Sequence, residues 1–483
     1  MKDFLFGVAT AATQIEGGYN QDGKSLSVWD NYSAKGLIKN KHTCFTACDC
    51  YNRLEEDLAL IKELGINAYR FSINWTRIQP HGKGPINPKG IDYYNRLIDG
   101  LLSIGVKPVV TLFHWDLPVE FLEFGDFSNR EIIKRFEEYG KIVAENFGDR
   151  VDTFVTFNES AVVLDFLYAR PVGAGYPPRS EKELLVAMHN LLMCNAAMTY
   201  SLRKYSKLPV KVGMTNVSYI KLPKEPWMEE KVKEATFRPG AKFYESNTSY
   251  LDPIIFGKYN EDIVKKFDLD LSFIQEGDME YINCGFDFIG MNIYCGKLAE
   301  VNEKGEVVDS IPSVNAALGG GGGDLTGTSS VMYYGPKFMN ERYGLPVYVM
   351  ETGVTVTEWK CLDGTINDAM RADFLERYVG ALVQAKKDGV DIRGCFVWSL
   401  MDNFEWSSGY SQRFGIVHVD FETLERTKKL SFYLSKLLGD SDKAFHWHGH
   451  NLIMLNRHSE STRYRGHDGK RLYTVTFARQ NKF

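Results

Sequence analysis

The chain has 483 residues, of which 44% are hydrophobic and 25% are charged, and its formal net charge is −5. This composition is typical of a globular enzyme, and the absence of a basic stripe or Lys/Arg block argues against nucleic acid as a partner. No apolar run is long enough for a membrane-spanning helix, so we expect no membrane partner. The eight cysteines are scattered, which predicts reduced thiols in a cytoplasmic protein rather than a disulfide framework.

The apolar stretch from Phe4 to Ile15 has some features of a signal-peptide core. Asp3 precedes it, no basic segment leads into it, and Glu16 closes it. We therefore interpret this stretch as a strand.

Apolar, β-branched runs alternate with amphipathic segments along most of the chain. The runs predict strands at Phe4–Ala9, Ala68–Ile73, Val109–Phe113, Val151–Phe157, Val210–Met214, Phe286–Met291, Val347–Met350 and Arg393–Trp398. The segments between them predict helices over residues 54–64, 94–101, 129–148 (capped by Asn129), 181–205, 334–343, 369–387 and 431–438. Eight strands alternating with helices indicate an α/β fold, a single (β/α)8 TIM barrel. Extended βα loops account for the excess over the roughly 250 residues of a minimal barrel.

We assign residues 1–440 to the barrel and residues 441–483 to a short C-terminal extension of unknown role. The glycine run Gly319–Gly323 predicts a flexible loop. Five of the ten histidines lie in the extension, where His446, His448 and His450 alternate. A metal site is one interpretation of this alternation. A solvated or partly packed extension is the favoured one, and we assign no metal.

Two glutamates carry the most informative chemical signal. Glu159 follows the fourth predicted strand and Glu351 follows the seventh. In (β/α)8 barrels the active site lies at the C-terminal ends of the strands, so both side chains are expected in one site. Glycoside hydrolysis needs two such carboxyl groups, because one protonates the leaving oxygen while the other attacks the sugar carbon or activates a water.

Other strand ends add polar and aromatic side chains. They are Gln14, Glu16, Arg70, His114, Trp115, Asp116, Asn158, Asn292, Tyr294, Trp398, Glu405 and Trp406. Each has an ordinary structural interpretation, such as core packing for a Trp or an ion pair for an Arg. Together with Glu351 they occupy seven strand ends, which instead favours a site for a neutral, polyhydroxylated ligand, since amides and carboxyls bind hydroxyls and indoles cover C–H faces. No phosphate loop or metal-ligand spacing accompanies them, so we predict no cofactor.

Four segments resemble glycoside hydrolase family 1 β-glucosidases. They are Phe4–Gly17, Ala68–Ile73, His114–Pro118 and Trp398–Trp406, and the resemblance runs from Phe4 to about Leu438. It implies a retaining β-glucosidase that acts without a cofactor on small β-glycosides and oligosaccharides. The expected glycone is a terminal non-reducing β-D-glucosyl residue, with galactosyl and fucosyl residues as alternatives. Oligomeric state is left open.

The resemblance also implies roles for single residues. Glu159 matches the general acid/base and Glu351 the nucleophile. Arg70 and Tyr294 match groups that orient the nucleophile, and Trp398 matches the indole under the sugar ring. The remaining substrate-binding residues are expected to be Gln14, His114, Trp115, Asn158, Asn292, Glu405 and Trp406.

Three positions depart from the family pattern. Ser160 stands where the family usually has Pro, Thr352 where it has Asn, and Cys50 where it has His. None removes a catalytic carboxyl group, so they bear on rate and substrate preference more than on the reaction. A tryptophan common before the seventh strand is also absent around Leu325 to Val331, which predicts looser aglycone binding.

Two alternatives remain open from the sequence. A 6-phospho-β-glycosidase would carry Ser in place of Glu405 and Tyr in place of Phe414, so both residues argue against it. A catalytically weak sugar-binding barrel is suggested only by the altered neighbours of the two glutamates. Retention of both carboxyls together with Arg70 and Tyr294 argues against this second alternative.

Overall fold

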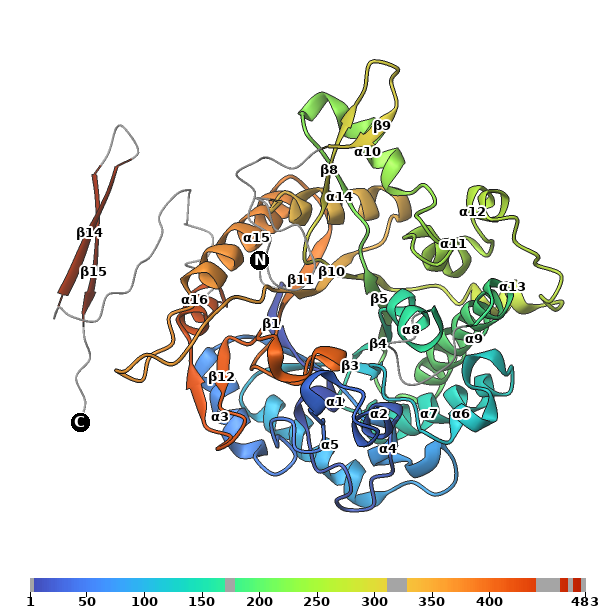
Figure 1. Cartoon of the computed structure of the whole chain (residues 1–483), viewed down its shortest axis with the longest axis horizontal. Coiled ribbons are helices and arrows are strands. Elements are labelled where there is room, and N and C mark those ends of the chain that lie inside the picture. The colour runs from blue at the N-terminus through green and yellow to red at the C-terminus, as the bar shows by residue number, and fades with distance from the viewer. Residues whose placement is uncertain (1–3, 170–178, 311–327, 440–460, 468–471, 479–483) are drawn as a thin grey trace.

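The computed structural model describes residues 4–169, 179–310, 328–439, 461–467 and 472–478. Eight parallel strands close into a barrel at the centre of the molecule (Figure 1), which confirms the predicted fold. In order around the barrel they are β1 (Leu5–Ala9), β2 (Ala68–Ser72), β3 (Lys107–Phe113), β4 (Thr153–Asn158), β5 (Lys211–Val217), β7 (Phe288–Asn292), β10 (Val347–Thr352) and β11 (Ile392–Trp398).

Helices surround the ring of strands (Figure 1) and bury its outer face. The main ones are α3 (Leu54–Leu64), α5 (Pro88–Ser103), α7 (Ile132–Phe147), α9 (Glu181–Tyr205), α14 (Val331–Tyr343), α15 (Ala369–Lys387) and α16 (Leu430–Gly439). Every residue of β2, β4, β7 and β10 is buried, as expected for parallel strands covered by helices. This burial explains why the strands are continuous apolar runs in the sequence.

Three predicted strands continue further toward the site than the sequence indicated. β4 includes Asn158, β7 includes Asn292, and β10 includes Glu351 and Thr352. Backbone pairing continues because Glu351 is in register with Asn292. Polar side chains at these positions resemble the beginning of a loop in the sequence, although their backbones remain in the sheet.

Two local predictions were wrong. Asn129 does not cap α7, which begins at Ile132 and has Glu131 as its N-cap; Asn129 Oδ1 accepts from the Glu131 N–H over 3.0 Å. The stretch from Phe4 to Ile15 is not one strand, because β1 ends at Ala9 and α1 (Ala12–Ile15) follows. The Ala12 N–H donates to Ser72 Oγ over 2.8 Å, which anchors this helical turn to the end of β2.

The loops that follow barrel strands β5 and β7, together called the insertion, contain elements that the sequence analysis did not predict. β6 (Lys221–Pro223), β8 (Lys297–Val301) and β9 (Val307–Asp309) form a small sheet beside α10 (Glu229–Thr236), at the top of Figure 1. The insertion also contains α11 (Thr248–Phe256), α12 (Glu261–Lys266) and α13 (Asp278–Ile282). Met228, Val232 and Ala299 give the small sheet its own apolar core.

In the C-terminal extension, β14 (Ser461–His467) pairs with β15 (Leu472–Ala478) as an antiparallel two-stranded sheet. The glycine run and His446, His448 and His450 lie outside the described residues. Within the described residues, no helix is both long and apolar enough to cross a membrane.

The boundary between barrel and extension generates a prediction. A chain that ends after Gly439 keeps all eight barrel strands and α16, so we expect its kcat on a small aryl β-glycoside to stay within about twofold of the full chain. Steady-state kinetics on both forms, with circular dichroism to verify folding, measures this. Loss of activity in a folded truncated protein would instead mean that the extension contributes to the site.

Candidate active site

Glu351 lies near the end of β10 and is almost fully buried. Arg70 Nη1, from β2, donates to Glu351 Oε1 over 2.7 Å, and Tyr294 Oη donates to Glu351 Oε2 over 2.6 Å. Both oxygens therefore have donors that stabilise the ionised carboxylate and hold its orientation. Burial, and then the charge of Glu351, raise the pKa of Tyr294 well above its usual value, so the phenol retains the proton that it donates.

Glu159 directly follows β4 and adopts a left-handed backbone conformation, with φ 52° and ψ 62°. Such conformations are uncommon outside glycine and concentrate at functional sites. The Glu159 N–H donates to Thr215 O over 2.8 Å, which ties this conformation to β5. The side chain then meets β7, because Asn292 Nδ2 donates to Glu159 Oε1 over 2.8 Å.

Two asparagines connect the carboxyl groups of Glu159 and Glu351. Asn158 Oδ1 accepts from Arg70 Nη2 over 2.8 Å and from Asn292 Nδ2 over 3.1 Å. A continuous series of contacts therefore runs from Glu351 through Arg70, Asn158 and Asn292 to Glu159. The four strands β2, β4, β7 and β10 supply it, with Glu159 placed directly after β4.

A second group of residues gathers after β11. Gln14 Nε2, on α1, donates to Glu405 Oε2 over 3.1 Å, to Asn403 Oδ1 over 3.0 Å and to Phe404 O over 2.7 Å. The buried Gln14 Oε1 has no partner among the described residues, and neither has His114 Nδ1. Unpaired buried polar atoms are costly, so these two are suited to bind the hydroxyls of a ligand.

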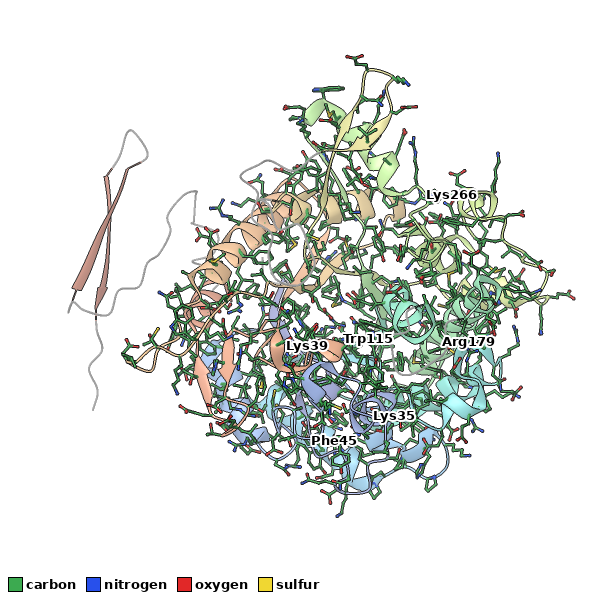
Figure 2. All side chains as sticks on the ribbon, viewed as in Figure 1. Lys35, Lys39, Phe45, Trp115, Arg179 and Lys266 are labelled. Carbon is green, nitrogen blue, oxygen red and sulfur yellow. The ribbon has the colours of Figure 1, made fainter. Side chains whose placement is uncertain are left out.

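Aromatic rings border this group. Trp406 lies with its ring centroid 4.4 Å from that of Trp115 and 5.8 Å from that of His114, and Trp398 lies 5.8 Å from His114. Trp115 Nε1 donates to Asn158 O over 2.8 Å. Figure 2 shows Trp115 near the middle of the view, inside the ring of helices.

Burial controls the charge states in the site. Burial, and then the charge of Glu351, raise the pKa of Glu159 to about 8. The same two causes raise the pKa of Glu405 to about 8. Burial, and then Arg70, lower the pKa of His114 well below its usual value. At neutral pH the site therefore holds two protonated carboxyls and a neutral imidazole beside the Arg70–Glu351 ion pair.

All twelve residues predicted for the site lie in these two groups or their aromatic border, whereas two other strand-end candidates have structural contacts. Glu16 Oε2 accepts from Arg77 Nε over 2.8 Å, and Asp116 Oδ2 accepts from the Trp75 N–H over 2.7 Å.

The sequence analysis missed two residues that support the site. Thr215 Oγ1 donates to Asn292 Oδ1 over 3.0 Å, and Asn403 accepts from Gln14. Thr215 lies on the fifth strand, whose C-terminal end was not considered. Asn403 lies inside one of the family segments, so its position could have identified it.

The three departures from the family pattern leave both carboxyls in place. Ser160 is buried at the first position of α8 (Ser160–Leu164), where proline is also well tolerated. Thr352 and Cys50 are buried. Gly353 follows Thr352. A Cβ at this position would lie 2.0 Å from Trp398 O, so the position requires glycine.

No cluster of three or more His, Cys, Asp or Glu residues in the described part of the chain is arranged to hold a metal ion.

Residues 1–443 match Glycosyl hydrolase family 1. The chain belongs to this family. It is 38% identical over 438 residues to beta-glucosidase A of Thermotoga maritima, which covers 89% of this chain and 95% of that protein. It is 34% identical to a bifunctional beta-D-glucosidase/beta-D-fucosidase of Bifidobacterium breve. That alignment covers 89% of this chain and 96% of the relative. The solved Thermotoga maritima beta-glucosidase in complex with glucoimidazole superimposes with a TM-score of 0.81 at 37% identity, covering 91% of this chain and 98% of that one.

The raised pKa of Glu159 predicts that the stability of this glycoside hydrolase falls as the pH rises from about 4.5 to about 8. The folded state holds the proton up to about pH 8, whereas an ordinary glutamate loses it near 4.5, so stability declines as pH rises between these values. Glu159→Gln removes this effect. We expect the variant to match the wild type near pH 4 and to be more stable near pH 8, by on the order of a few kcal/mol at most.

Thermal melts at several pH values measure this difference. Glu276→Gln, at an exposed position, is the matched control and should change Tm little at any pH. A constant Tm difference between wild type and Glu159→Gln across the pH range would contradict the assigned shift.

Proposed function

We propose that the protein is a retaining β-glucosidase that releases terminal β-D-glucosyl residues from the non-reducing ends of small glycosides and oligosaccharides. The observation that carries this proposal is the asymmetric carboxyl pair. Glu351 is held as a carboxylate by Arg70 and Tyr294, while burial and the charge of Glu351 keep Glu159 protonated. Two carboxyls in such different environments, one paired with a cation and one without, are suited to act as nucleophile and acid.

In the first step, Glu351 attacks the anomeric carbon while Glu159 transfers its proton to the glycosidic oxygen. The C–O bond to the aglycone breaks, and the sugar becomes an ester of Glu351. Arg70 and Tyr294 orient the attacking carboxylate, because each donates a hydrogen bond to one of its two oxygens.

In the second step, the same glutamate acts as a base. Once Glu351 is an ester, its charge no longer raises the pKa of Glu159. Glu159 then accepts a proton from the water that attacks the anomeric carbon, and Glu351 leaves as a carboxylate. Two inversions restore the original β-configuration.

The residues after β11 and around His114 are proposed to bind the glycone. Gln14, His114, Asn158 and Glu405 offer donors and acceptors to the hydroxyls. The protonated Glu405 can both donate to and accept from the O4 and O6 hydroxyls. Trp398 and Trp406 offer ring faces to the sugar, and Trp115 packs against Trp406. Asn292 holds Glu159.

Relatives named as beta-glucosidases support glucose as the glycone. Cellobiose is a candidate natural substrate. A fucosyl glycone is a second candidate, because one relative is named for both activities. The cytoplasm is the proposed compartment, supported by eight cysteines that form no disulfide in the described structure.

The 6-phospho-β-glycosidase alternative lacks support in the site. The described contacts of the Glu405 side chain are with Gln14, a neutral amide, and a half-buried carboxyl group offers no positive charge to a phosphate. The sugar-binding alternative lacks support as well, because the contacts of Glu351 would have no purpose in a passive site.

The stereochemical outcome tests the main proposal. Retention requires the two carboxyl groups to stand about 5–5.5 Å apart, so that Glu351 attacks directly. Proton NMR during early hydrolysis of an aryl β-glucoside should show β-glucose before α-glucose. If α-glucose came first, water rather than Glu351 would be the attacking group, and the mechanism would be inverting.

The two glutamates should respond differently to substitution. Glu351→Ala should stop turnover of every substrate, because the attacking oxygen is gone. Glu159→Ala should lose about 10²–10⁴-fold on poor leaving groups but still cleave a dinitrophenyl glucoside in the first step. The glycosyl-enzyme should then accumulate as a burst.

Azide gives the control for this assignment. A small anionic nucleophile needs no general base, so azide should restore turnover of Glu159→Ala and form a β-glycosyl azide. Rescue of Glu351→Ala in this way, without rescue of Glu159→Ala, would reverse the two roles.

Glu405 should decide between neutral and phosphorylated glycones. Glu405→Ser removes the carboxyl that binds O4 and O6, so kcat/KM on an aryl glucoside should fall by at least about tenfold. Glu422→Ser, at an exposed position, is the control and should leave it unchanged. Faster cleavage of a 6-phosphoglucoside than of a glucoside by the wild type would refute this assignment.

A further inference from the structure

A buried cluster of charged side chains lies beyond the glycone end of the site. Its members, here called the ion cluster, are Glu358, Asp368, Arg371, Asp402, Arg413 and Lys429. Three carboxylates and three cations balance one another, and all but Arg413 have side chains at most 1% exposed. None of the six contacts Glu159 or Glu351 in the described structure, so the proposed mechanism does not use them.

Asp402 is the point where the ion cluster reaches the glycone site, because it stands three residues before Glu405. Its Oδ1 accepts from Lys429 Nζ over 2.7 Å and from the Gly415 N–H over 3.1 Å, and its Oδ2 accepts from Arg413 Nη1 over 2.7 Å. Burial alone would raise the pKa of Asp402, but Lys429 and Arg413 outweigh it and lower the pKa below its usual value. Both carboxylate oxygens are therefore fixed.

The other end of the ion cluster holds the segment that follows Glu351. Lys429 also pairs with Glu358, and Glu358 Oε2 accepts from Arg371 Nη1 over 2.7 Å. Arg371 Nε donates to Val354 O over 3.1 Å, three residues after Glu351. Arg371 Nη2 donates to Arg413 O over 2.7 Å, so Arg371 also contacts the segment after β11.

The two segments joined in this way have little regular structure of their own. Glu405 and Trp406 stand at the start of a short 3-10 helix, η6 (Trp406–Ser411), and Trp406 has a φ of 47°. Burying six charges is costly, and such networks rarely add net stability over apolar packing. What a fully paired network does provide is one defined arrangement of the chain segments that carry it.

We propose that the ion cluster is a positioning device for substrate recognition. Asp402, held by Lys429 and Arg413, places Glu405 and Trp406 against the glycone. Glu358 connects this arrangement to the segment that follows Glu351. The inference rests on the proposed function, in which Glu405 binds the O4 and O6 hydroxyls of the sugar.

The test compares two substrates that differ only at O6, an aryl β-glucoside and the matching aryl β-6-deoxyglucoside. The wild type should prefer the glucoside in kcat/KM by roughly tenfold or more, the value of a hydrogen bond to a well-placed polar group. In Lys429→Met, and to a smaller extent in Arg413→Met, this preference should fall at least about threefold, because Glu405 is no longer held in place.

Lys428→Met is the matched control. Lys428 is the neighbouring residue but pairs with Glu63 at the surface, over 2.7 Å, so its removal should leave the preference unchanged. Lys429→Arg retains the positive charge and should recover at least part of the preference. A purely structural role for the ion cluster would lower the rates on both substrates equally, and an unchanged preference in a folded Lys429→Met protein overturns the proposal.

Two further outcomes are decisive. If Lys429→Met does not fold, Arg413→Met decides, because the Arg413 side chain is 26% exposed and its loss is better tolerated. Equal rates of the wild type on the two substrates would also overturn the inference, since no O6 contact would exist to position. A wild type inactive on every β-glucoside would refute the proposed function itself, whereas an active wild type with unchanged preference in the folded variants refutes only the positioning role.

Discussion

The positive charge of Arg70 faces more carboxyl groups than it can neutralise. Its guanidinium is 1% exposed and pairs directly with Glu351, while Glu159 and Glu405 lie close enough for the charge of Glu351 to act on both. A buried carboxylate without a partner is strongly disfavoured, so one cation permits one anion. Glu351 takes the charge because Tyr294 adds a second donor, and the other two carboxyls retain their protons.

The barrel makes this arrangement possible by bringing distant segments to one edge. Arg70 and Glu351 are 281 residues apart in sequence and meet because the C-terminal ends of β2 and β10 face the same space. The site also concentrates unusual backbone geometry, since Trp115, Glu159 and Trp406 all have positive φ. Each such residue costs about 1–2 kcal/mol. Contacts with Thr215 and Asn158 and the packing of Trp406 on Trp115 hold these conformations in place.

The sequence was sufficient for the eight barrel strands, because strands covered by helices on the outside are continuous apolar runs. It did not predict where these strands end, because Asn158, Asn292 and Glu351 are polar residues that nevertheless remain in the sheet. The small sheet of β6, β8 and β9 was missed because its strands are short and come from two loops, one before and one after β7. Spacing alone could not reveal the ion cluster, whose members are spread between residues 358 and 429 with α15 and β11 among them. The roles proposed for Glu159 and Glu351 come from the resemblance; the geometry adds that Glu351 pairs with Arg70 whereas Glu159 accepts from Asn292.

On the proposed mechanism, the same charge constraint governs the covalent intermediate. When Glu351 becomes an ester, Arg70 loses its counter-charge. In that step Glu159 gives its proton to the leaving group and becomes a carboxylate, so the site again holds one cation and one anion. The hydrogen bonds through Asn158 and Asn292 already join Arg70 to Glu159, so the new anion forms in contact with this network. Attack and protonation are therefore coupled by electrostatics, since either one alone would leave a buried charge unbalanced. This coupling explains why an asparagine pair, rather than a second cation, separates the two glutamates: a second cation would keep Glu159 ionised before its proton was needed.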